Sequence, residues 1–203
     1  MPATASWYSV KYGLNMFVST AGGATTEAAY SPDGAKWTPS SLPVSGDWRA
    51  LEFGNNRFIA ISYGSTDTAI STNGTSWTVG GALPASRNWT DIVYGENTFV
   101  AIATGSDKGA YSTDNGATWQ EMTMPSSSNW RSITYGNGTF VAISNTTGTI
   151  AAYSADGITW NPAVLPNSRA WVAVAFGNNL FCAIASSSTS GGAKVAQSAS
   201  TGA

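Results

Sequence analysis

Three features of the chain predict an all-β fold built from one repeated unit. Five tryptophans recur at a spacing of 41 residues, namely Trp7, Trp48, Trp89, Trp130 and Trp171. Each tryptophan opens the same pattern, in which an aliphatic residue, an aromatic residue and a glycine precede a polar turn and an apolar strand. A second tryptophan follows a serine-glycine turn in four of the repeats. A repeat of this length matches one four-stranded blade, so the sequence predicts a five-bladed β-propeller formed by a single domain, residues 1–203.

The first half of each repeat predicts a β-hairpin. The inner copies begin WRALEFG at Trp48, WTDIVYG at Trp89 and WRSITYG at Trp130, and each is followed by an asparagine-containing turn and by FIAI or FVAI. Turns of this kind between β-branched and aromatic runs favour tight antiparallel hairpins. The predicted blades span residues 7–47, 48–88, 89–129, 130–170 and 171–203, with residues 1–6 added to the last.

The second half of the repeat carries a turn motif that ends in a tryptophan. Its acidic or amide residue can accept hydrogen bonds from backbone N–H groups one or two residues on, and its glycine supplies a positive φ. We expect the tryptophan to pack over the turn. Because Asn73 keeps the acceptor in the second copy, we interpret these residues as structural caps and not as catalytic acids. The motif residues are Asp33, Asn73, Asp114 and Asp156, with Trp37, Trp77, Trp119 and Trp160.

These turns resemble the Asp-boxes of sialidase-type and other β-propellers. Ser112–Trp119 matches the usual form S-x-D-x-G-x-x-W at full length, whereas the other three copies are one residue shorter. The five-blade count is similar to that of tachylectin-2-like lectins, and the whole repeat resembles repeats of bacteriophage tail and virion proteins. The resemblance covers essentially the entire chain. It implies a propeller fold, and a lectin-like or virion protein is the expectation that follows from it.

The two ends of the chain predict how the ring closes. Met1–Trp7 aligns with Met124–Trp130, and the fifth copy reaches Ser198–Ala203 without a turn tryptophan. We therefore expect the N-terminal segment to complete the last blade and to close a ring of five, because closure hides edge strands. Three well-formed strands are expected in the last blade, with a weak or absent fourth.

Composition narrows the classes of partner. Charged residues make up 10% of the chain and the net charge is −2, which disfavours nucleic acid. No apolar run is long enough to insert into a membrane, and Met1 is followed by neither a basic start nor an apolar stretch. We expect synthesis in the cytosol and a location in a virion or outside the cell without a classical signal peptide. The oligomeric state stays open.

Catalysis is not expected. The chain has no histidine and one cysteine, Cys182, which occupies a strand position held elsewhere by valine or isoleucine. This removes the commonest general base and leaves no zinc site, so neither a metal nor another cofactor is expected. Two arginine pairs, Arg49 with Arg131 and Arg87 with Arg169, are equivalent positions in different blades. We interpret them as surface residues that recur at equivalent positions of the repeats, and not as parts of one convergent pocket. A glycosidase, the remote alternative, requires carboxylates clustered on one face.

Binding is the favoured function, on the face formed by the loops between strands two and three and between strands four and one. These loops vary among the repeats and carry hydroxyl and amide groups that suit sugar hydroxyls. Tyr63 lies outside the core pattern and, beside Asp67, can stack on a sugar ring; the alternative is that it covers the edge of the second blade. The partner is a surface glycan or, alternatively, other virion proteins in a capsid or tail. The candidate ligand-binding residues are Tyr63, Asp67, Arg87, Asn88, Asn129 and Arg169.

Overall fold

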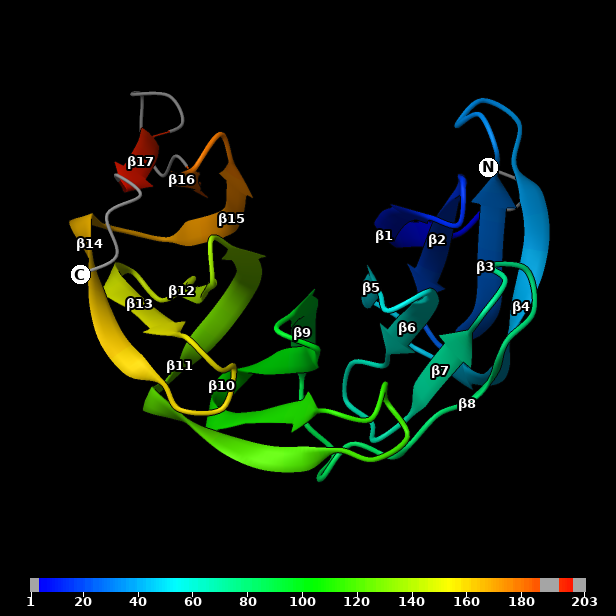
Figure 1. Ribbon diagram of the computed structural model, residues 1–203, viewed down its shortest axis with the longest axis horizontal. Coiled ribbons are helices and arrows are strands. Elements are labelled where there is room, and N and C mark those ends of the chain that lie inside the picture. The colour runs from blue at the N-terminus through cyan, green and yellow to red at the C-terminus, as the bar shows by residue number, and fades with distance from the viewer. Residues whose placement is uncertain (1–3, 187–193, 199–203) are drawn as a thin grey trace.

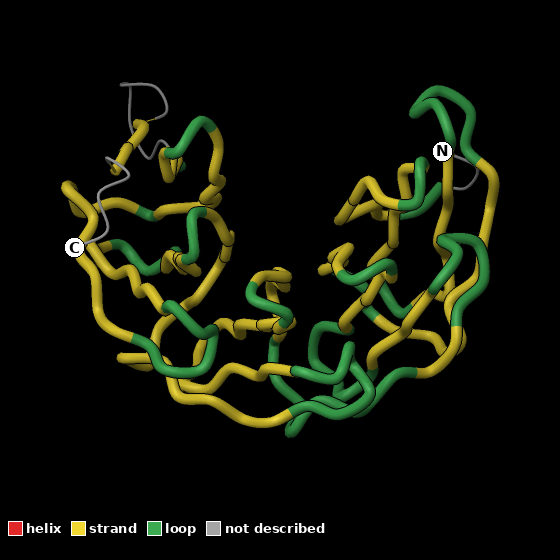
Figure 2. Tube along the Cα trace, in the orientation of Figure 1, coloured by secondary structure: helices red, strands yellow, loops and turns green. Residues whose placement is uncertain are grey.

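The computed structural model describes residues 4–186 and 194–198, all of them in strands, turns and loops. Successive antiparallel sheets follow one another around an arc, with the chain running from one end of the arc to the other (Figure 1). Figure 2 shows the same arc as strands separated by short turns. Within the described residues, no helix is present that has the length and apolar character needed to cross a membrane.

The first two repeats each form a four-stranded sheet in chain order. The first contains β1 (Ser6–Gly13), β2 (Met16–Gly22), β3 (Thr25–Ser31) and β4 (Thr38–Gly46). The second contains β5 (Ala50–Gly54), β6 (Arg57–Ile61), β7 (Thr68–Ser71) and β8 (Thr78–Val79).

The third and fourth repeats form one six-stranded sheet, which is an outcome the sequence did not predict. Its strands are β9 (Trp89–Gly95), β10 (Thr98–Ser112), β11 (Gln120–Gly136), β12 (Thr139–Ser144), β13 (Gly148–Ser154) and β14 (Asn161–Arg169). The ladder between β10 and β11 continues through the loop residues, pairing Thr104 with Asn129 and Ser106 with Ser128. Each of these two long strands therefore takes the place of two strands, and five sequence repeats give four sheets.

The last sheet has three strands in the described part of the chain: β15 (Trp171–Gly177), β16 (Leu180–Ala185) and β17 (Lys194–Ser198). The predicted ring closure is not seen. Ser6 pairs with Gly22 inside the first sheet, so it does not extend the last one, while residues 1–3 and 199–203 lie outside the described residues. β1 and β15 stand at opposite ends of an open arc (Figure 1). Closure by the N-terminal segment stays a prediction from the sequence.

The hairpins that open the repeats have the turn geometry that their residues favour. In the second and fifth repeats both turn residues are asparagines with positive φ, Asn55 (44°), Asn56 (57°), Asn178 (50°) and Asn179 (59°). Two residues of positive φ match the twist of the flanking strands, as a type I′ turn does. Asparagine tolerates this conformation better than most residues with a side chain.

The core lies between successive repeats, where the repeated aromatic residues pack. Trp48, Trp89, Trp130 and Trp171 are at most 1% exposed. The turn tryptophans pack in clusters that combine two repeats: Trp77 with Val18, Trp119 with Ile59, and Trp160 with Val100. Packing therefore runs from each repeat to the next along the arc, which is the arrangement of blades in a propeller.

Candidate functional site

The second residue of each repeat lies near the inner side of the arc, and these residues line two adjoining cavities. The cavities measure 250 Å³ and 200 Å³ and share Arg49, Thr90, Arg131 and Val172. We call their combined lining the arginine pocket. The first cavity adds Tyr63, Thr104, Asn129 and Asn145, and the second adds Tyr8, Ser9, Asp91 and Ser132.

The arginine pocket corrects one interpretation of the sequence. Arg49 and Arg131 occupy equivalent positions of different repeats, and we interpreted them as separate surface residues. They line the same cavities. The physical reason is the curvature of the arc: residues at one position of the inner strands all point toward a common centre. Equivalent positions therefore converge in this fold, where in a linear array they would diverge.

Arg49 is held in place by three groups. Its Nη2 lies 2.7 Å from Asp47 Oδ2, and its Nε donates to the same oxygen at 2.9 Å. Its guanidinium lies over the Tyr63 ring, 3.9 Å from the centroid, and 5.1 Å from the Tyr8 centroid. Tyr63 N donates to Asp47 O at 2.8 Å, so the tyrosine loop and the arginine share one anchor. One face of the Tyr63 ring is thus occupied by a cation.

Arg131 differs from Arg49 because it is exposed and has no counter-ion among the described residues. Within residues 4–186 the guanidinium of Arg131 donates no hydrogen bond. Around it, Asn129 and Asn145 are joined through their backbones, with Asn145 N donating to Asn129 O at 2.8 Å. The pocket therefore presents one free guanidinium beside amide and hydroxyl side chains.

Two carboxylates near the pocket connect neighbouring repeats. Glu52 Oε2 lies 2.6 Å from Lys11 Nζ, and its Oε1 accepts from Phe53 N at 3.0 Å. Asp91 Oδ1 accepts from Ile92 N and Oδ2 from Ile133 N, both at 2.9 Å. Both oxygens of each carboxylate are therefore engaged. Burial raises the pKa of Glu52 and of Asp91. The nearby Lys11 and the backbone donors lower the same pKa values, but the effect of burial is larger.

Asp91→Asn removes a buried charge but keeps only one acceptor oxygen, so either Ile92 N or Ile133 N would face the amide NH2 group without an acceptor. We expect these two effects to offset at neutral pH and to leave the free energy of unfolding within about 1 kcal/mol of that of the unaltered protein. The raised folded-state pKa means that the stabilising contribution of Asp91 is complete below 3.8 and is lost as pH rises through the folded value. The variant should therefore become less stable relative to the unaltered protein as the pH falls. Urea unfolding at several pH values measures this, and a relative stability that does not fall toward acidic pH contradicts it.

The remaining candidate ligand-binding residues do not line the arginine pocket. Asp67 accepts from Ser65 Oγ at 2.5 Å, and Arg87 forms an ion pair with Glu121. The backbone carbonyl oxygen of Asn88 accepts from Thr104 N at 2.9 Å. Arg169 pairs with Gly148 across β13 and β14. Of the six candidates, only Tyr63 and Asn129 line the pocket, and Arg49, Arg131, Thr90, Thr104 and Asn145 are the residues that sequence reasoning missed.

The two sets of loops do lie side by side. Bridging pairs join them in each of the first four repeats: Thr25 with Gly46, Ser65 with Arg87, Ser106 with Ser128, and Gly148 with Arg169. This pairing places the loop residues on one edge of the sheets. Arg87 and Arg169 take part in these pairs and do not line the pocket, whereas Asn129, which follows Ser128 in the chain, does.

The turn-motif residues cap their own turns. Asp33 Oδ1 accepts from Ala35 N and Lys36 N at 2.8 and 2.9 Å, and Asn73 Oδ1 accepts from Thr75 N and Ser76 N at 3.0 and 2.9 Å. Asp114 accepts from Thr118, and Asp156 accepts from Ile158 N and Thr159 N. The hydrogen bond from Lys36 N lowers the pKa of the Asp33 carboxyl. No group of three or more metal-ligating side chains occurs in the described part of the chain.

Comparisons with known proteins identify the fold. No curated protein sequence matches the chain significantly. Among solved structures, virginiamycin B lyase from Staphylococcus aureus superposes with a TM-score of 0.78 at 13% identity, covering 98% of this chain and 72% of that one. YCF48 from Cyanidioschyzon merolae gives 0.68 at 14% identity, covering 91% and 65%, and YCF48 bound to a D1 peptide gives 0.68 at 18%, covering 91% and 62%.

The chain spans less than two thirds of the length of these YCF48 structures, and identities this low establish the fold alone. The family is established separately. The model of the DUF6242 beta propeller domain matches residues 81–201, more than half of the sequence. The chain therefore belongs to the DUF6242 beta propeller domain family.

Proposed function

We propose that the protein is a non-catalytic binding module whose arginine pocket takes the carboxylate of an acidic surface glycan. The observation that carries the proposal is the convergence of Arg49 and Arg131 on one pocket, with Arg131 lacking a counter-ion among the described residues. A guanidinium binds a carboxylate through two parallel N–H donors. Asn129, Asn145 and Thr104 supply the donors and acceptors that sugar hydroxyls require.

The two arginines have different roles in this proposal. Arg49 is already paired with Asp47 and stacked on Tyr63, so it forms part of the wall and contributes little free charge. Arg131 is available to the ligand. The sequence suggested sugar stacking on Tyr63; because one face of its ring is covered by Arg49, only its other face is open for such a contact.

The proposal of a non-catalytic role is supported by the nearby carboxylates. Asp91 and Glu52 each use both oxygens in bonds that connect repeats or stabilise the local backbone. A glycosidase needs one carboxylic acid that is free to donate a proton and a second carboxylate that is free to act as base or nucleophile. A carboxylate whose two oxygens are both engaged can take neither of these catalytic roles unless its contacts are broken.

A glycan array that includes uronic-acid and sialic-acid polysaccharides tests the function. We expect selective binding of acidic glycans, and Arg131→Ala should weaken it about tenfold to a hundredfold, because hydrogen bonds to charged groups contribute roughly 1.5–3 kcal/mol. Arg87→Ala is the matched control, since Arg87 is paired with Glu121 and does not line the pocket. Equal affinity of the Arg131 variant and the unaltered protein would contradict the assignment, as would the absence of any glycan binding.

A role in assembly is the second candidate, and one specific observation favours it. Tyr8, Val10 and Tyr12 on β1 are 52–56% exposed, whereas Leu51, the equivalent of Val10 in the second repeat, is 1% exposed. An apolar and aromatic surface of this kind suits a protein partner. Within a phage particle it would fit a capsid or tail decoration protein. Cross-linking from Tyr12 in assembled particles distinguishes this role from glycan binding.

A further inference from the structure

Repeats two to five share one backbone frame at the arginine pocket. In each of them, the carbonyl of the residue before the opening tryptophan accepts a hydrogen bond from the residue five positions after the phenylalanine of the second strand. The four bonds measure 2.8–2.9 Å and join Tyr63 N to Asp47 O, Thr104 N to Asn88 O, Asn145 N to Asn129 O, and Ser186 N to Ala170 O. The residue after the tryptophan lines both cavities of the pocket in all four frames, as Arg49, Thr90, Arg131 or Val172. The frames are therefore matched in backbone geometry and differ in their side chains.

The frame of repeat two neutralises its arginine. Asp47 lies two residues before Arg49, and its Oδ2 atom receives both Nη2 and Nε of the guanidinium. Tyr63 covers the same guanidinium, with its ring centroid 3.9 Å away. An arginine that a carboxylate engages through two N–H groups retains little charge for an external anion. Arg49 is therefore a structural residue of the pocket wall.

The frame of repeat four holds an arginine without either of these groups. Asn129 and Asn145 stand where repeat two has Asp47 and Tyr63, each of them two repeats of 41 residues further along the chain. Both asparagines line the pocket, and their side-chain amides form no hydrogen bond within residues 4–186. An amide carries no formal charge, so it cannot act as the counter-ion of Arg131.

We propose that Asn129 is the specificity-determining residue of the arginine pocket, because the side chain at this position decides whether Arg131 is available to an external carboxylate. The inference rests on the ligand-binding role proposed above for Arg131. An aspartate at position 129 would take the place that Asp47 has beside Arg49 and would compete with the ligand from within the same molecule. Asparagine leaves the guanidinium free and offers a donor and an acceptor to the hydroxyl groups next to the carboxylate of an acidic sugar.

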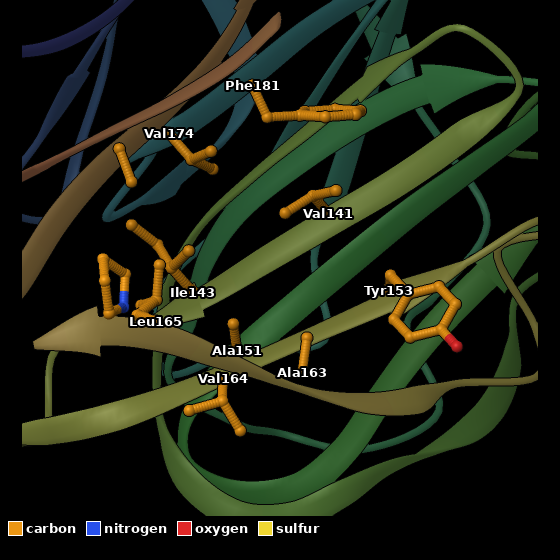
Figure 3. A pocket seen from close by; sticks show the side chains of 11 residues that line it. Val141, Ile143, Ala151, Tyr153, Ala163, Val164, Leu165, Val174 and Phe181 are labelled. Carbon is orange, nitrogen blue, oxygen red and sulfur yellow. The ribbon is translucent and has the colours of Figure 1, made fainter. Parts of the chain in front are cut away.

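The apolar cavity between repeats four and five provides no alternative site for an anion. It measures 230 Å³, and its lining includes Val141, Ala163 and Phe181 (Figure 3). None of the residues that line it is charged. A carboxylate placed there would be removed from water without a charged partner, which is costly. The arginine pocket and the apolar cavity therefore suit ligands of different chemistry.

Asn129→Asp tests the proposal directly, with glucuronate as the probe. We expect the affinity of the full chain for glucuronate, measured by NMR titration at low ionic strength, to fall about fivefold or more. Asn88→Asp is the matched control, because it adds the same charge to the frame of repeat three, where Thr90 follows the tryptophan in place of an arginine. Equal affinity of the Asn129 variant and the unaltered protein would overturn the proposal, as would an equal loss in the control.

A measurement without ligand separates this inference from the proposed function. Phenylglyoxal modifies guanidinium groups, and mass spectrometry of the digested protein gives the rate at each arginine. We expect Arg131 to react about threefold or more faster than Arg49 in the unaltered protein, and to lose this difference in Asn129→Asp but not in Asn88→Asp. This pattern in a protein that binds no glucuronate would contradict the proposed function and support the role of position 129. An Arg131 rate that Asn129→Asp leaves unchanged would overturn the inference.

The reverse exchange provides a gain of reactivity. Asp47→Asn combined with Tyr63→Asn gives Arg49 the side chains that flank Arg131, and we expect the phenylglyoxal rate of Arg49 to rise about threefold or more. The asparagine at position 47 keeps an oxygen for Gly23 N, which donates to Asp47 Oδ1 at 3.0 Å. Thermal unfolding verifies that the double variant is folded. If Arg49 stays unreactive in the folded double variant, the flanking side chains do not control the guanidinium and the proposal is overturned.

Discussion

Gly136→Ala is expected to destabilise the protein by about 1–3 kcal/mol, whereas Gly177→Ala leaves its stability nearly unchanged. Both glycines end the first strand of a repeat, in the same sequence context. A Cβ on Gly136 would lie 2.1 Å from the Phe176 ring of the next repeat, and a Cβ on Gly177 would meet nothing within 4 Å. The aromatic ring of one repeat thus packs directly on the glycine of the repeat before it.

The same contact recurs at Gly13 with Phe53, Gly54 with Tyr94, and Gly95 with Tyr135. Gly136 has no positive φ that would itself disfavour alanine, so the effect isolates the steric contact. Urea unfolding of both variants measures the difference in the free energy of unfolding. An equally large loss at Gly177 would show that this glycine also receives an aromatic ring, as a closed ring with Tyr12 at the junction requires.

The sequence predicted the repeat because its packing depends on residue types at fixed spacing. Trp89 and Trp130 fill equivalent buried sites, and the turns at Asn55 and Asn178 need residues that accept positive φ. These requirements act within one repeat or between adjacent repeats, so the same residue types recur at a fixed spacing in the sequence. The continuous β10 and β11 were not predictable, because the loop pairing of Thr104 with Asn129 has no distinct residue pattern.

The arginine pocket was missed for a different reason. Its members come from several repeats, and only the curvature of the arc brings Arg49 and Arg131 together. A comparison of the repeats identifies equivalent residues as copies of one position, but it does not show that these copies become neighbours in a radial fold. The stacking of Arg49 on Tyr63 likewise depends on the path of a variable loop. The ion pair of Arg87 with Glu121 removed a candidate that looked free in the sequence.

Trp160→Ala is expected to destabilise the protein by about 3–5 kcal/mol, the usual effect of removing a buried tryptophan. Trp37→Ala, the same change in the same motif, should have an effect of about 1 kcal/mol or less. Trp160 is 8% exposed and packs against the preceding repeat, whereas Trp37 is only partly buried because no described repeat precedes its own. Both indoles donate to the carbonyl of their own turn, so the hydrogen bonds within the motif are matched.

The difference between the two tryptophan variants therefore measures packing between repeats and not the turn itself. Thermal unfolding followed by circular dichroism gives both values. If stability resided in the turn motif, the two variants would lose the same amount, and that result would contradict the packing account. A large loss at Trp37 together with a large loss at Gly177 would have a different meaning. The two lie on repeats at opposite ends of the arc, so only a contact between the first and fifth repeats would make both changes costly at once.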